Sequence, residues 1–223
     1  IEGVQNKESP DWLKKDLESI GQKSISAIVD ITNYVMIDMN RPLHAYDANK
    51  ISGKIIVRRS KKSEHFEALD NKKYELSAED CVIADQSKVL GLGGIIGGVS
   101  TGTEMSTTDI VLEAASFDPI TIAKSSKKLG LLTDAKYRFE RGVDPMSIEE
   151  GLVKASKLIH EICGGKISSI KVAGKSNYKE KKIVFTIANF KKLIGFEISS
   201  TESKSILEDL GFGVKNKKNT LEL

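Results

Sequence analysis

The chain has 223 residues, of which 39% are hydrophobic and 29% charged. This balance is ordinary for a soluble globular protein, and no apolar run approaches the roughly 18 residues that a membrane-spanning helix needs, so we expect no membrane partner. Lys and Arg exceed Asp and Glu by 34 to 31. So small an excess excludes a nucleic-acid binder recognisable by net charge alone, and leaves open a local basic patch.

The two cysteines indicate no metal site. Cys81 and Cys163 lie far apart, with no CxxC pair and no histidine at zinc-ligand spacing. The sequence therefore supports neither a zinc site nor a disulfide framework, and we expect no bound metal and a reducing, cytoplasmic location. No signal segment is recognisable. Because the chain begins at Ile1 and stops in the strand-like NTLEL, we interpret it as an excised part of a longer protein.

The first fifth of the chain predicts two helices and a strand. Ser9 as N-cap and Pro10 at the first helical position begin a helix in SPDWLKKDLESIG, and the final glycine stops it. The next segment is SISAIVDITNYVMIDM. Its first half is rich in β-branched residues and predicts a strand. Its second half, residues 31–39, has helical spacing and predicts a helix that Asp30 caps. His44 then falls in a turn, RPLHAYD.

The middle of the chain predicts a meander of antiparallel strands. Short β-rich runs alternate with turn signals in KIIVRRS, EHFEALDNKKYEL, DCVIADQSKVLGLGG and DIVLEAASF. Two helices with clear start and stop signals follow, one from Pro119 to Gly130 and one from Pro145 to Cys163. A strand over residues 168–172 is expected to close the domain.

The pattern predicts an α+β protein with two domains. Residues 1–173 form the first domain, and the lysine-rich segment 174–182 is a linker. Residues 183–223 begin a second, small α/β module. In it a strand and a short helix in IVFTIANFKKLIG precede a capping box, Ser199 to Glu202, a second helix and a lysine-bearing hairpin.

The glycine-rich stretch GLGGIIGG, residues 91–98, does not fit a nucleotide-binding motif. The GxGxxG spacing fails at Ile96, and no GK[ST] follows. Glycines at this density let the backbone pass close to a ligand or to another strand. The sequence leaves both interpretations open.

Two polar residues are candidates for a site. Glu113 shares one side of the strand alternation in DIVLEAASF with Val111 and Ala115. Either this face is solvated and Glu113 has no role, or the carboxylate lies in an apolar recess and needs a partner there. His44 is either a hydrogen-bonded structural residue or a catalytic one, and no Ser or Cys nucleophile is apparent beside it.

The segment TDAKYRFERGVDP, residues 133–145, combines charged residues of both signs with two aromatic residues. We expect Arg138, Glu140 and Arg141 to form ion pairs that hold a loop between helices. Thr133 and Ala135 are small, which suits a pocket wall.

Four segments, in this order and spacing, resemble the bacterial phenylalanyl-tRNA synthetase beta-subunit family: VDITNYVMIDMNRPLHAYD, CVIADQSKVLGLGGIIGG, VLEAASFDP and LGLLTDAKYRFERGVDP. The resemblance covers residues of roughly 10 to 170, the editing module of that family. It implies a β-rich module of antiparallel sheets flanked by helices. The chain from Ile183 resembles the start of the next, winged-helix-like or DNA-binding-like module.

The resemblance implies a function. An apolar amino-acid pocket rejects an isostere with one added hydroxyl by only about 100-fold, so a phenylalanine site charges some tRNA with tyrosine. A second site that hydrogen-bonds the hydroxyl discriminates by roughly 10⁴ or more. The family's beta subunit hydrolyses tyrosyl-tRNA(Phe) in this way. The alternative is a non-catalytic RNA-binding or structural module, since a related fold serves in lysidine synthetases.

The resemblance also implies roles for single residues. Glu113 corresponds to the carboxylate that reads the tyrosine hydroxyl, and His44 to a histidine beside the ester, which orients water or accepts a proton. Gly97 corresponds to a pocket-wall glycine, and Thr133 and Ala135 to the small residues that shape the recess.

The same resemblance implies partners and cofactors of a whole enzyme. Lys23 stands where relatives carry Arg, and it is expected to contact the 3′ end of tRNA(Phe) as a point charge. An alpha subunit is implied as the partner, in a heterotetramer of two alpha and two beta subunits. ATP and magnesium serve the synthetic reaction of that enzyme, and none is expected in this segment.

Overall fold

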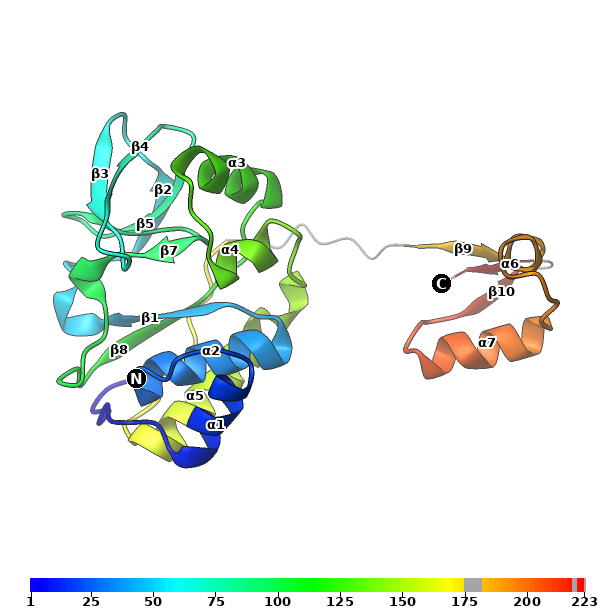
Figure 1. Cartoon of the computed structure of the whole chain (residues 1–223), viewed down its shortest axis with the longest axis horizontal. Helices are drawn as coiled ribbons and strands as arrows, with labels where there is room; N and C mark the ends of the chain where they lie inside the picture. Colours follow the sequence, from blue (N-terminus) through cyan, green and yellow to red (C-terminus); the bar gives the residue numbers. More distant parts are fainter. Residues whose placement is uncertain (175–181, 218–219, 223) are drawn as a thin grey trace. The chain divides into compact units, whose positions relative to one another are not determined.

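The computed structural model describes residues 1–174, 182–217 and 220–222 (Figure 1). It divides into two compact units, Ile1–Ala173 and Gly174–Leu223. The expected linker falls almost wholly on residues 175–181, which lie outside the described residues. Both units combine helices with antiparallel strands, so the predicted α+β class is confirmed.

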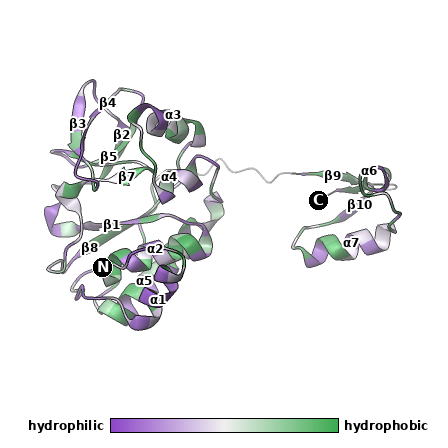
Figure 2. Cartoon of the chain, in the orientation of Figure 1, coloured by the Kyte–Doolittle hydropathy of each residue, from purple (hydrophilic) through white to green (hydrophobic). Residues whose placement is uncertain are grey.

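The first unit begins with a layer of three helices under a two-stranded ribbon (Figure 1). Helices α1 (Asp11–Ser19), α2 (Ala27–Met39) and α5 (Ile148–Cys163) pack against one face of strands β1 (Leu43–Asp47) and β8 (Ile110–Ala114). Figure 2 shows the apolar residues of α2 and α5 in green. Burial of these apolar faces is the main favourable free-energy contribution to this layer.

The predicted strand before α2 is wrong. The helix begins at Ala27, and Asp30 lies inside it, fully buried, rather than at its cap. The Asp30 carboxylate accepts hydrogen bonds from the Ser9 and Ser24 hydroxyls, at 2.6 and 2.5 Å, and from the backbone N–H of Ile25 at 2.8 Å. The N-cap of α1 is Pro10 rather than Ser9, and the first helical residue is Asp11 rather than Pro10. Tertiary packing against α1 and α5 overrides the β preference of this β-branched segment.

The predicted antiparallel strands are confirmed but do not run as one meander, because Ile110–Ala114 pairs with β1 in the ribbon and Ile56–Arg59 pairs with Cys81–Ala84. Most of these strands lie in a second layer. Its four-stranded sheet has the order β2 (Ile56–Arg59), β5 (Cys81–Ala84), β6 (Val89–Leu92) and β7 (Ile96–Gly97). Strands β3 (Glu64–Glu67) and β4 (Lys73–Leu76) form a hairpin beside it. Helix α3 (Pro119–Leu129) is confirmed, with Asp118 as its N-cap, and it packs on this layer.

Two further expectations for the first unit are corrected. The loop predicted around the ion pairs contains a short helix, α4 (Asp134–Phe139), because Phe139 is buried in the second core and Thr133 caps the helix. No strand forms over residues 168–172, where the described backbone has no partner strand. Exposed Ile170 and Val172 show that β-branched composition without a partner does not make a strand. Helix α5 is confirmed, with the turn Pro145–Ser147 before it.

The ribbon separates the two cores of the first unit. Leu43, Ala45 and Leu112 face the helical layer. Tyr46 faces the other way and packs with Ile83 and Leu90 of the sheet. The ribbon is therefore covered on both faces, which places its alternate residues in the interior between two layers.

The second unit is a small three-stranded sheet with two helices. Its sheet has the order β10 (Lys215–Lys217), β11 (Thr220–Glu222) and β9 (Val184–Thr186), and its helices are α6 (Ile187–Ile194) and α7 (Ser199 cap, Ser200–Asp209). The Ser199 hydroxyl accepts from the Glu202 N–H at 3.1 Å, as the capping box predicts. The tip of the expected lysine hairpin, residues 218–219, lies outside the described residues.

Candidate functional site

Strands β1 and β8 bring two polar side chains together. In their antiparallel register His44 is the direct partner of Glu113. Opposite residues of an antiparallel pair project from the same face, with Cβ atoms roughly 5 Å apart. The turn predicted at His44 is therefore wrong, because His44 lies in a strand and its side chain points toward the sheet layer.

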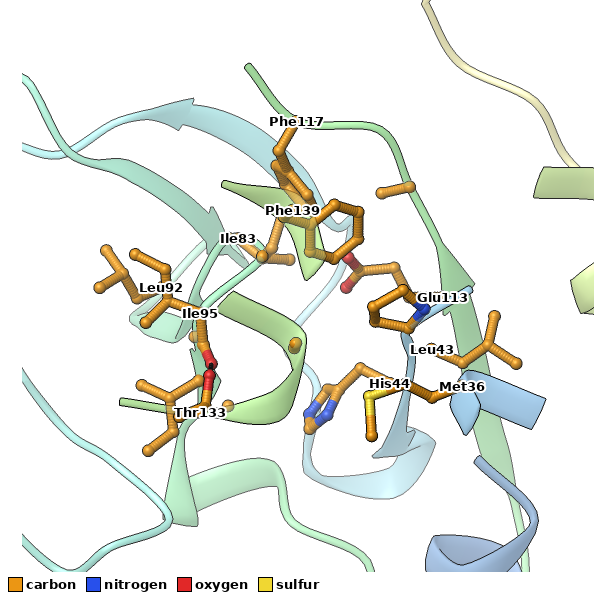
Figure 3. A pocket seen from close by; sticks show the side chains of 18 of the residues that line it. Met36, Leu43, His44, Ile83, Leu92, Ile95, Glu113, Phe117, Thr133 and Phe139 are labelled. Atoms are coloured by element: carbon orange, nitrogen blue, oxygen red, sulfur yellow. Dashed lines mark hydrogen bonds between the residues drawn. The ribbon is translucent and has the colours of Figure 1, made fainter. Parts of the chain in front are cut away.

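This face of the ribbon opens into a cavity of about 370 Å³. That volume lies within the roughly 300–1,000 Å³ typical of small-molecule sites. Figure 3 shows Glu113 and His44 on one side of the cavity, Thr133 and Ile95 on the other, and the rings of Phe117 and Phe139 beside Glu113. Five residues singled out by the sequence line it, namely His44, Gly97, Glu113, Thr133 and Ala135. Glu113 therefore faces a mainly apolar cavity rather than an outer, solvated sheet surface.

The glycine-rich stretch lets the backbone of the cavity wall lie close to the side chains of His44 and Phe117. A Cβ atom on Gly97 would lie 2.4 Å from Cε1 and 2.6 Å from Nε2 of His44, so the imidazole rests on the Gly97 backbone. A Cβ atom on Gly94 would lie 2.7 Å from the Phe117 ring, and one on Gly98 would lie 2.7 Å from the carbonyl oxygen of Leu90. Glycine is needed here both for a close strand crossing and for the cavity wall.

His44 is a neutral imidazole with an unused nitrogen. Burial lowers the pKa of His44 to about 4, because the protein interior disfavours the charged form. Its Nε2 is buried and has no hydrogen-bond partner among the described residues. A buried polar atom without a partner costs free energy unless water or a ligand satisfies it. The arrangement leaves Nε2 available to a molecule in the cavity.

Glu113 is held by a tyrosine from the neighbouring strand. The Tyr46 hydroxyl donates to Oε2 of Glu113 at 2.5 Å. Burial raises the pKa of Glu113, and the hydrogen bond from Tyr46 opposes that rise. Burial and the nearby carboxylate also raise the pKa of Tyr46, so the phenol stays protonated and acts as a donor.

Thr133 and Ala135 connect the cavity to α4. The Thr133 hydroxyl donates to the carbonyl oxygen of Ile95 at 2.7 Å and accepts from the N–H of Lys136 at 3.1 Å. Thr133 therefore caps α4 and ties it to the glycine-rich stretch between β6 and β7. Small side chains at this point keep the wall opposite His44 and Glu113 open.

Comparison with known proteins identifies the fold family of the first unit. The family model for the B3/4 domain matches residues 1–164. The chain belongs to the B3/4 domain family. The His44–Glu113 cavity therefore lies within a B3/4 domain.

Three relatives of the chain are phenylalanine–tRNA ligase beta subunits. The chain is 48% identical to that of Rhodopseudomonas palustris, 45% to that of a Wolbachia species from Brugia malayi and 44% to that of Mesorhizobium japonicum. The matches cover 96%, 97% and 95% of this chain but only 27%, 27% and 26% of those proteins. The chain therefore spans about a quarter of the length of these curated relatives.

Several solved chains also resemble this one, and one of them is a synthetase fragment. An N-terminal fragment of the phenylalanyl-tRNA synthetase beta subunit from Pyrococcus horikoshii is 16% identical, with a TM-score of 0.49. The match covers 99% of this chain and 61% of that one.

Lys23 does not line the cavity of the B3/4 domain. It is exposed in the segment between α1 and α2. Its neighbour Gln22 donates to Oδ2 of Asp134 at 2.9 Å, and Asp134 is a lining residue. Lys23 is therefore held beside the cavity wall by its neighbour, outside the cavity itself.

Sequence reasoning missed three side chains that shape the site. Tyr46 could have been found from the alternation in LHAYD, which puts it on the face of His44, had the strand been recognised. Phe117 and Phe139 pack edge to face with ring centroids 5.0 Å apart and form an apolar wall. Phe117 lies in the loop between β8 and α3 and Phe139 lies at the end of α4, so no local pattern pairs them.

The expected ion pairs are present, inside and just after α4. Arg138 pairs with Asp134 at 3.3 Å, and Glu140 pairs with Lys136 at 2.8 Å and with Arg141. Within the described ranges no group of three or more His, Cys, Asp or Glu side chains could hold a metal ion. No described helix is both long and apolar enough to cross a bilayer.

Proposed function

We propose that this B3/4 domain is the editing site of a phenylalanine–tRNA ligase and that it hydrolyses the tyrosyl ester of mischarged tRNA(Phe). One observation carries the proposal. The Glu113 carboxylate, with one oxygen engaged by Tyr46, faces an apolar cavity beside a neutral His44 whose Nε2 is unused. A carboxylate among apolar walls discriminates a phenol from a phenyl ring, because only the phenol donates a hydrogen bond to it.

The chemistry follows from the two side chains. Glu113 accepts a hydrogen bond from the tyrosine phenol and thereby holds the amino acid in place. His44 Nε2 accepts a hydrogen bond from the water that attacks the ester carbonyl. The water oxygen bonds to the carbonyl carbon, and the bond from that carbon to the ribose oxygen breaks. The proton that the water loses ends on the ribose oxygen, which leaves free tyrosine and uncharged tRNA. An imidazole with a pKa near 4 is a weak base, so His44 orients the water more than it removes its proton. Positioning of this kind suffices for an activated ester.

The rest of the assembly belongs to the same proposal. Phenylalanine activation lies on an alpha subunit, where ATP and magnesium serve, in an enzyme of two alpha and two beta subunits in the cytoplasm. Lys23 contacts the 3′ end of the tRNA near the cavity. The second unit begins a small DNA-binding-like module after the linker.

The test uses a two-subunit enzyme whose beta subunit carries this segment. Deacylation of tyrosyl-tRNA(Phe) and phenylalanyl-tRNA(Phe) is followed with Glu113 intact and with Glu113→Ala. We expect fast loss of the tyrosyl ester alone, and we expect the substitution to abolish it. Glu75→Ala, which removes an exposed strand carboxylate, is the matched control. Slow and equal loss of both esters, with Glu113 intact and with Glu113→Ala, would instead support a non-catalytic tRNA-binding or structural module.

A further inference from the structure

Tyr46 occupies an unusual place beside the proposed hydroxyl reader. Its side chain is buried, with 2% of its surface exposed, and its ring packs among Ile83, Leu90 and the imidazole of His44. The His44 and Tyr46 rings meet edge to face with centroids 4.4 Å apart. Tyr46 therefore contacts both side chains to which the proposed function gives a role.

The hydrogen bond from Tyr46 has a defined effect on the carboxylate. It is the sole side-chain hydrogen bond of Glu113 among the described residues, and it uses only Oε2. A carboxylate has two oxygens and about four acceptor positions, so Oε1 stays free for a second donor. A donor fixed in a packed core also fixes the rotamer of its acceptor and favours the ionised form.

The hydroxyl of Tyr46 is not needed to fill the core. A phenylalanine would fill the same space between Ile83 and Leu90 and would make the same ring contact with His44. What only tyrosine supplies is the donor at 2.5 Å from Glu113. The phenol group is thus the part of this residue that needs a functional explanation.

We propose that Tyr46 is the positioning residue that sets the hydroxyl selectivity of the pocket, by holding Oε2 of Glu113 and presenting Oε1 as the acceptor for the substrate phenol. This inference rests on the proposed editing function and deepens it. Without the Tyr46 hydroxyl, Glu113 gains rotamer freedom and is more readily protonated in its apolar surroundings. A protonated or misaimed carboxyl group distinguishes tyrosine from phenylalanine less well.

The experiment compares Tyr46→Phe with the unaltered two-subunit enzyme. We expect the ratio of kcat/KM for tyrosyl ester to that for phenylalanyl ester to fall about tenfold, the effect of one charge-assisted hydrogen bond. The loss should appear mainly in KM for the tyrosyl ester, since His44 keeps its ring contact. A matched control is Tyr74→Phe, which removes a hydroxyl that donates to Asp70 at 2.7 Å on the outer hairpin. It should leave the ratio unchanged.

A double substitution separates positioning from structural damage. In a Glu113→Ala background, Tyr46→Phe should cause no further change in the ratio, because the group it positions is gone. An unchanged ratio for Tyr46→Phe alone, or an equal loss on both esters, would overturn the positioning role while leaving the editing function intact. Absence of tyrosyl-selective hydrolysis in the unaltered enzyme would instead overturn the editing function, and this inference with it.

Discussion

Gly97→Ala is a sharp test of how the cavity is built, because it acts on His44 without altering it. The new Cβ atom would lie 2.4 Å from Cε1 and 2.6 Å from Nε2 of the imidazole. Ordinary contacts need about 3.5–4.0 Å, so the ring must move by roughly 1 Å or more. The third neighbour, Leu69 Cδ1 at 3.1 Å, must also shift slightly.

The direction of that movement determines the magnitude. The imidazole borders a cavity of about 370 Å³ and can swing into it, so the cost in unfolding free energy should be about 1 kcal/mol, at the low end for overpacking. The catalytic cost should be larger. A misplacement of about 1 Å in a positioned catalytic group can reduce a rate by roughly 100-fold.

The assay is tyrosyl-tRNA(Phe) deacylation by a two-subunit enzyme, together with thermal unfolding of the same preparation. Gly102→Ala is the matched control, because its Cβ atom would meet Leu69 and Val99 at 3.4 Å, an ordinary contact. We expect Gly97→Ala to lose most deacylation with a small change in Tm, and Gly102→Ala to lose little of either. Full activity in Gly97→Ala would show that His44 need not rest on this backbone, and would refute the reasoning.

Three further predictions concern stability. Arg41 is fully buried and donates to Ser147 Oγ at 3.0 Å and to the Ala115 and Asp144 carbonyl oxygens. Arg41→Ala should therefore cost about 3 kcal/mol in urea unfolding, because three acceptors lose a donor and the buried side chain leaves a cavity. Asp30→Ala should cost about 2 kcal/mol in the same assay and speed hydrogen exchange at Ile25, which loses its acceptor. The pKa of His44 is lowered to about 4, so the unfolded state binds more protons than the folded state between pH 6.5 and pH 4. The free energy of unfolding should therefore fall by up to about 3 kcal/mol as the pH drops through that window. His44→Gln should remove this pH-dependent loss of stability. An unchanged pH dependence in His44→Gln would show that the imidazole is not buried as described.

Local sequence patterns predicted the elements whose signals lie within a few residues. Asp118 before Pro119 and Gly130 at φ 67° delimit α3 in the sequence as they do in the structure. The same holds for α5 and for the Ser199 cap of α7. Capping and turn chemistry depends on side chains one to four residues apart, so it can be read without knowing the tertiary contacts.

The errors lie where distant partners decide. Residues 24–30 have strand-like composition, yet residues 27–30 form the first turn of α2 because α1, α5 and the ribbon surround them. Residues 168–172 have the same composition and form no strand, because the described chain offers them no partner. β-Branched composition shows that a segment suits a buried or strand-paired position. Only the tertiary structure decides whether the segment becomes a buried helix, a paired strand or neither.

The candidate site shows the same division. By itself the sequence determined which residue types are available: a carboxylate in an alternating strand, a lone histidine, a glycine-rich stretch and small residues before a helix. The register of β1 on β8 placed His44 opposite Glu113, and the Gly97 backbone came to rest against the imidazole. Tyr46 reached the carboxylate from the neighbouring strand. Such contacts join residues more than 50 positions apart, so their geometry and the electrostatics of burial arise only when the layers pack together.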